Sequence, residues 1–153
     1  MIYNFENSKP QINQDVLNCV ENYFNIKLPE SYRQYLLEVN GGMGKRNIFL
    51  FPNTCNNGSS ISHWYGIRSD PHFSLLQEMY DRGVRYPEHF ISICEDVFGN
   101  KLLLSLKGPD YGKIYFWDHE QETDTPDYSN LTLIADSFDE FINGLKSEEE
   151  IEA

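Results

Sequence analysis

The stretch LPESYRQYLLEVNGGMG, residues 28–44, contains a helix start, a helical period and a helix stop in that order. Pro29 suits the first helical position, because its fixed φ fits a helix and its missing N–H would have no partner there. One helical face is formed by Tyr32, Tyr35, Leu36 and Val39. The Asn-Gly-Gly run at 40–42 then predicts a left-handed C-cap. The stretch therefore predicts one short amphipathic helix whose aromatic side packs on the domain while the tyrosine hydroxyls reach water.

Helical and strand periods alternate along the remaining chain. Residues 1–10 have little pattern and predict an extended lead-in, whereas residues 12–24 have apolar side chains at helical spacing. A helix–loop–helix unit is therefore expected before the sheet. The elements expected next are a strand at 47–51, a turn-rich loop at 53–60, a strand at 61–67 and a helix at 74–82 capped by Asp70 or Ser74.

The second half of the chain predicts a meander of antiparallel strands followed by a helix. The expected strands are 90–94, 102–106 and 114–117, joined by short turns, with a short edge strand at 131–134. Ser137 and Glu140 have the spacing of a capping box at the start of the last helix. The fold expected is a single α+β domain over residues 1–153. In it, the N-terminal helix–loop–helix and the C-terminal helix pack on an antiparallel sheet of about five or six strands. Its core spans residues 12–145, and 146–153 form a frayed acidic tail.

Length and cysteine usage favour a domain that folds without metals or disulfides. A chain of 153 residues can bury a sizeable core. Its three cysteines, Cys19, Cys55 and Cys94, are odd in number and irregularly spaced, which argues against a disulfide framework or a zinc site. Buried, inert thiols are expected at Cys19 and Cys94. A secretory leader and an apolar run of about 18 residues are both missing from the sequence, so a cytoplasmic location is expected.

The charge balance narrows the range of partners. Twenty-four acidic residues against 12 basic ones give a formal net charge of −12. Such a chain repels phosphate backbones, so direct nucleic-acid binding is not expected, and a basic protein partner is favoured. The alternative is that the acidity only serves solubility, since the SEEEIEA tail alone supplies several charges.

Three strings in this order carry a resemblance to a known family. They are the LP-x-x-Y-x-x-Y-L-x-x-x-N-G-G pattern from Leu28, YFWDHE at 115–120 and ADSFDEFINGL at 135–145. Together they resemble the SUKH superfamily, the Smi/Knr-type domain of fungal cell-wall regulators and bacterial immunity proteins. The resemblance implies the α+β fold described above. For a small stand-alone chain it implies an immunity protein that binds and neutralises a cognate toxin.

Two other functions remain open at this point. One is a regulatory protein-interaction scaffold of the cell-wall-regulator type, which would usually need long disordered flanks that this sequence lacks. The other is a small hydrolase that uses the adjacent carboxylates of Glu95 and Asp96. The sequence lacks the activated nucleophile, metal triad or nucleotide loop that an enzyme would need, so no catalytic residue and no cofactor is expected.

The residue types that suggest metal or nucleophilic chemistry have unsuitable spacing. His119 lies between Asp118 and Glu120, but neighbouring residues on a strand point to opposite faces, so no metal site is predicted. Cys55 and His63 lack a third orienting group and a feature that would lower the thiol pKa. The GGMG run at 41–44 follows a helix and has no lysine, unlike a phosphate loop.

Partner contacts are expected at acidic loops near the strand ends. The segments free for this are around Glu95 and from Asp118 to Asp127, because strand ends are not needed for the core. The predicted partner-binding residues are Glu95, Asp96, Asp118, Glu120, Glu122, Asp124 and Trp64. For Trp64 core packing is the competing interpretation. A nuclease is the toxin for which this acidity makes most physical sense, because an acidic protein can occupy its basic groove.

Overall fold

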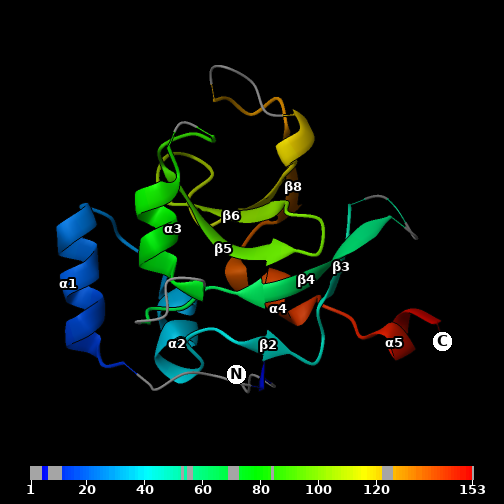
Figure 1. Cartoon of the computed structure of the whole chain (residues 1–153), viewed down its shortest axis with the longest axis horizontal. Coiled ribbons are helices and arrows are strands. Elements are labelled where there is room, and N and C mark those ends of the chain that lie inside the picture. Colours follow the sequence, from blue (N-terminus) through cyan, green and yellow to red (C-terminus); the bar gives the residue numbers. More distant parts are fainter. Residues whose placement is uncertain are drawn as a thin grey trace.

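A six-stranded antiparallel sheet with consecutive strands side by side, from β3 to β8, forms the centre of the fold in the computed structural model (Figure 1). The structure describes residues 5–6, 12–52, 54, 57–68, 73–83, 85–121 and 126–152. The strands are β3 (Ile48–Leu50), β4 (Gly58–Trp64), β5 (Phe90–Asp96), β6 (Lys101–Ser105), β7 (Ile114–Trp117) and β8 (Leu131–Ala135). A separate pair joins β1 (Phe5–Glu6) to β2 (Met43–Gly44). The predicted antiparallel meander and edge strand are confirmed.

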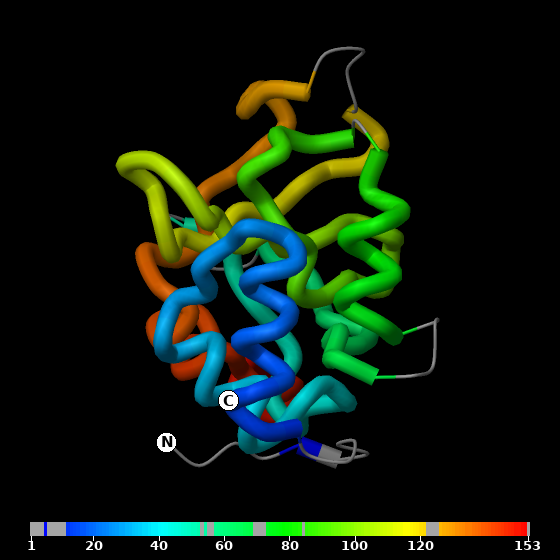
Figure 2. The backbone as a smooth tube through the Cα atoms, turned by 90° about the vertical axis from the view of Figure 1, so that its left-hand side faces the viewer, coloured from blue at the N-terminus to red at the C-terminus, as the bar shows by residue number. Residues whose placement is uncertain are grey.

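Helices from both ends of the chain and one from its middle accompany the sheet. Those before it are α1 (Gln14–Phe24) and α2 (Glu30–Glu38), α3 (Leu75–Asp81) lies between β4 and β5 in the chain, and α4 (Phe138–Asn143) follows β8. The short 3-10 helix η2 (His119–Gln121) follows β7, and the terminal helix α5 (Glu148–Glu152) stands apart from the sheet (Figure 1). Figure 2 shows α1 facing the viewer with α2 beside it, so the predicted helix–loop–helix unit is present. Ser74 and Ser137 cap α3 and α4 through their side chains. The α+β fold inferred from the sequence is confirmed.

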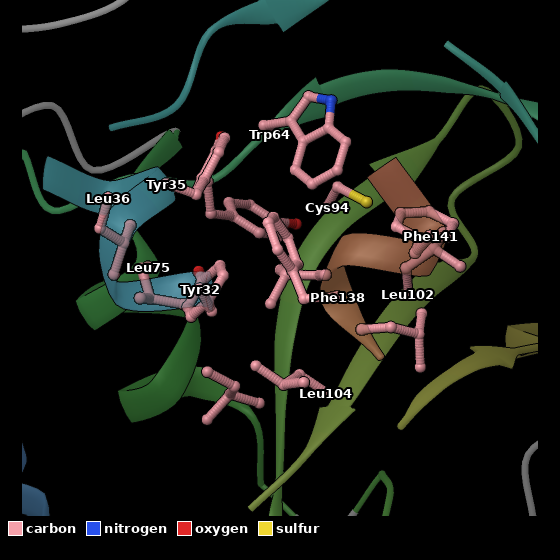
Figure 3. Close-up of a cluster of buried hydrophobic side chains, with 14 of the residues drawn as sticks. Tyr32, Tyr35, Leu36, Trp64, Leu75, Cys94, Leu102, Leu104, Phe138 and Phe141 are labelled. Carbon is pink, nitrogen blue, oxygen red and sulfur yellow. The ribbon is translucent and has the colours of Figure 1, made fainter. Parts of the chain in front are cut away.

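The main core lies between the helices and one face of the sheet. Figure 3 shows Tyr32 and Tyr35 of α2 packed beside Trp64, Phe138 and the strand side chains. Side chains of β6 alternate between faces, so Leu102 and Leu104 enter this core while Leu103 enters a second, smaller cluster. That cluster comprises Tyr86, Phe90, Leu103 and Trp117. The sheet is therefore buried on both faces along β6.

The helix α2 follows the sequence prediction closely, with three differences. Pro29 is the N-cap residue, one position before the first helical turn. The left-handed residue next to the helix is Asn40, with φ of 58°, and Gly41 and Gly42 follow with φ of 90° and 117°. The expectation that the tyrosine hydroxyls reach water is wrong for Tyr32 and Tyr35, because both side chains are 0% exposed.

Three local predictions are corrected by long-range backbone pairing or exposure. The loop expected at 53–60 is shorter, because Gly58–Ser60 pair with β3. The tail expected to fray begins with Lys146, whose N–H donates to the carbonyl of Ile48 at 2.8 Å, and then forms α5. Cys19 is exposed on α1, whereas Cys94 is buried as expected.

Candidate functional site

The buried carboxylate of Asp96 organises the turn between β5 and β6. Its Oδ1 accepts hydrogen bonds from the backbone N–H groups of Phe98 at 2.9 Å and Asn100 at 2.8 Å. Its Oδ2 accepts from Ser59 Oγ at 2.8 Å and from Asn100 Nδ2 at 3.1 Å. Asp96 is only 2% exposed, so its carboxylate cannot reach another protein. The prediction of a partner contact is therefore corrected for Asp96, which shapes the turn instead.

Two apolar side chains stand in solvent at the tip of this turn. Val97 is 54% exposed and Phe98 is 72% exposed. Gly99 has a φ of 86° and its N–H donates to the carbonyl of Asp96 at 3.3 Å, which closes the turn. The sequence analysis did not single out these two residues. The signal that could have found them is an apolar pair between Asp96 and Gly99, where turns usually have polar residues.

The acidic segment after β7 lies directly against the turn. The backbone N–H of His119 donates to Asn100 Oδ1 at 3.1 Å, and His119 Nε2 bonds the carbonyl oxygen of Phe98 at 2.9 Å. Asp118 Oδ1 accepts from the N–H of Glu120 at 3.0 Å at the start of η2. We use the term acidic turn surface for Val97, Phe98, Asp118 and Glu120. These residues come from two hairpins that hydrogen bonds join into one unit.

Glu95 faces a different set of partners from Asp96. Its Oε2 lies 3.2 Å from His63 Nε2 and its Oε1 lies 3.8 Å from Lys101 Nζ. The side chain is 27% exposed, so Glu95 is only partly available to a partner. Because the two carboxylates bond separate groups, they do not form the paired acid and base that the hydrolase alternative requires.

A cluster of charged side chains around Lys101 ties α3 to the sheet. Lys101 is 5% exposed, forms an ion pair with Glu78 of α3 and donates to the hydroxyl of Tyr65 at 3.1 Å. Burial, reinforced by Glu78, raises the pKa of Tyr65 above its usual range. Burial lowers the pKa of His63, which favours its neutral form, although the nearby Glu95 opposes this shift. The bonds of this cluster are made within the protein, which gives it a structural role.

The other predicted site residues are either buried or outside the described part of the chain. Trp64 is 1% exposed and packs edge-on against Phe138 in the core, which corrects its predicted role as a partner contact. Glu122, Asp124 and the nucleophile candidate Cys55 lie outside the described residues. Within the described ranges, no three His, Cys, Asp or Glu side chains gather as a metal site would need.

The fold and the site define an α+β domain with a hydrogen-bonded acidic turn surface and a buried ionic cluster. The chain belongs to the SMI1 / KNR4 family (SUKH-1), which matches residues 11–144. The resemblance noted in the sequence is thereby confirmed. Among the helices whose residues are described, none is long and apolar enough to cross a membrane.

One similar protein is the SPbeta prophage-derived uncharacterized protein YokK of Bacillus subtilis (strain 168). It is 38% identical to this chain over 88 residues. The alignment covers 58% of this chain and 42% of YokK, so the chain spans less than half the length of this curated relative.

Proposed function

We propose that this chain is an immunity protein that binds a basic toxin protein and blocks its activity. Family membership carries the proposal, because the match over residues 11–144 includes the whole sheet and the helices α1 to α4. The SMI1 / KNR4 family is one of immunity and regulatory proteins, so it supports binding rather than catalysis. The activity proposed is therefore occlusion of a partner.

The charge of the chain supports a basic partner. A formal net charge of −12 generates a negative field that raises the association rate of a positively charged protein. A nuclease fits this requirement, because its substrate groove already binds phosphates and an acidic protein can occupy it. The toxin proposed is a protein of this class.

The proposed contact region is the acidic turn surface together with the segment that follows it. Glu120 is exposed, Asp118 is partly exposed, and no ion pair with either carboxylate is found among the described residues. Their charges are therefore available to a cationic partner. Glu122 and Asp124 continue the acidic run and remain proposed contacts. Glu95, whose side chain is 27% exposed, is a proposed contact at the edge of this region.

Co-expression with the product of the adjacent gene, used as the candidate toxin, tests this function. The wild-type chain should restore growth, whereas Asp118→Lys with Glu120→Lys should slow association by at least about tenfold and weaken protection. The matched control is Glu148→Lys with Glu149→Lys, which changes the net charge equally on exposed α5 positions. The control should keep the thermal unfolding midpoint of the wild type, because exposed charges contribute little to stability, and the Asp118/Glu120 variant should lose at most the small contribution of the bond between Asp118 and the Glu120 N–H.

The possible outcomes separate the function from the position of the interface. Failure of the wild-type chain to protect cells would contradict the immunity function. Equal protection by the Asp118/Glu120 variant and the wild type would move the interface elsewhere while leaving the function in place. Equal loss in both double variants would mean that net charge, and no particular surface, governs binding.

A further inference from the structure

The tip of the β5–β6 turn has two exposed apolar residues where turns usually have polar ones. Gly99 satisfies the left-handed geometry and Asp96 satisfies the backbone donors, as turns of this kind require. Nothing in the turn requires Val97 and Phe98 between them, and each places an apolar side chain in water. Local rules of sequence and structure are most often broken at functional sites. The apolar pair is therefore a candidate contact for another molecule.

Hydrogen bonds on both sides hold Phe98 in place before any partner binds. Its N–H is bonded to Asp96, which is itself fixed by Ser59 and Asn100. Its carbonyl oxygen is bonded to His119 Nε2 at 2.9 Å. A side chain on a preorganised backbone loses less conformational entropy on binding. The backbone of Phe98 is thus held in place, and the residue is 72% exposed.

The surroundings of Phe98 restrict the chemistry of what it meets. His119 bonds both Phe98 and Asn100, and its chain neighbours are Asp118 and Glu120. The Lys101 ammonium, on the strand that follows the turn, is buried and paired with Glu78. An apolar projection with an acidic rim complements an apolar pocket surrounded by lysine or arginine.

We infer that Phe98 is the anchor residue of this chain's interface with its toxin. It inserts into an apolar pocket on the toxin, while Asp118 and Glu120 pair with cations at the rim of that pocket. His119 acts as a positioning residue, because it fixes the carbonyl of Phe98 through its Nε2. This inference rests on the proposed function and adds the particular residue and pocket chemistry.

Calorimetric titration against an inactivated form of the adjacent gene's product, used as the candidate toxin, tests the anchor. Phe98→Ala should raise Kd by roughly 30-fold or more, the loss typical of a central aromatic contact, and Phe98→Leu should raise it less. Tyr23→Ala is the matched control, because Tyr23 is 70% exposed on α1 and should leave Kd within threefold. Thermal unfolding of each variant verifies that the exposed substitutions leave the fold intact.

Two additional measurements separate the anchor from charge attraction. His119→Ala should weaken toxin binding severalfold while leaving Phe98 present, because the turn loses one of its bonds. Cytochrome c, a basic protein, serves as a probe for charge attraction, and its binding should not change in Phe98→Ala. An equal loss of cytochrome c binding and toxin binding in this variant would overturn the anchor.

Each result decides a different point. If the wild-type chain binds the toxin and Phe98→Ala binds it within threefold of the same Kd, the anchor is overturned while the proposed function stands. If the wild-type chain does not bind the toxin, both are overturned. A loss in Phe98→Ala that Tyr23→Ala does not share supports the anchor.

Discussion

Asn40 and the two glycines after it fix the exit from α2 through backbone geometry. The amide side chain of Asn40 accepts from the N–H of Ile67 at 2.7 Å and donates to its carbonyl at 2.8 Å. Gly66 passes so close that a Cβ on it would lie 2.1 Å from the carbonyl oxygen of Asn40. The signature at the end of the helix is therefore also a contact between two distant segments, which explains why it contains small residues.

Gly41→Val should lower the free energy of unfolding by more than about 1 kcal/mol. Its φ of 90° disfavours a side chain, and a Cβ would lie 3.1 Å from the N of Gly66 and the O of Trp64. Gly83→Val is the control, because Gly83 also has a positive φ but has no atom within 4 Å of its Cβ position. Urea denaturation should show the larger loss for Gly41→Val, and equal losses would contradict the close-contact account.

His63 should make the stability of the domain depend on pH. Burial lowers its pKa below the ordinary 6.5, and Lys101 acts in the same direction while Glu95 opposes it. The unfolded chain therefore binds the proton more readily. The stability that depends on a neutral His63 is fully present above about pH 6.5. It is lost as the pH falls from there toward the lowered pKa of His63 in the folded protein.

The comparison of wild type with His63→Gln isolates this effect from the other histidines. The wild-type unfolding midpoint should fall more between pH 7.5 and 5.5 than that of the variant, because only the wild type must take up a proton at this site on unfolding. Parallel pH profiles for the two proteins would contradict the assignment.

At the scale of elements, helices with local signals were predictable and pairings between distant strands were not. The helices α2 and α4 have apolar periods and start or stop signals within a few positions, so their buried faces and approximate bounds could be predicted from the sequence. Gly58–Ser60 have the composition of a loop, and only their pairing with β3 makes them a strand. The backbone pairing of Lys146 with Ile48 was likewise not predictable, because no pattern in the local sequence indicates it.

The short helix α5 should be dispensable for both stability and protection. Its described residues are all exposed, and its ion pair, Arg46 Nε to Glu150 Oε1 at 2.7 Å, is a surface pair of small energetic value. Truncation after Ser147 removes four glutamates and changes the formal net charge from −12 to −8. The unfolding midpoint should fall little and toxin protection should remain, whereas a loss of protection would assign α5 to the interface.

At the scale of the whole molecule, the sequence analysis proposed the acidic residues of the candidate surface but did not single out its apolar centre. Asp118 and Glu120 were identifiable because charged residues at strand ends are free of the core. Asp96 has the same charge, and only its four hydrogen bonds distinguish a buried turn residue from a surface contact. Phe98 resembles a core residue in the sequence, and its exposure follows from the direction of the turn.

The central claim is that one surface, formed by the β5–β6 turn and η2, holds the toxin. Hydrogen–deuterium exchange of the chain with and without the inactivated product of the adjacent gene, used as the candidate toxin, measures this most directly. The account predicts slower exchange on binding in residues 96–100 and 118–121, with unchanged exchange in α1 and α5. Slower exchange confined to other segments, or no change at saturating toxin, would contradict it.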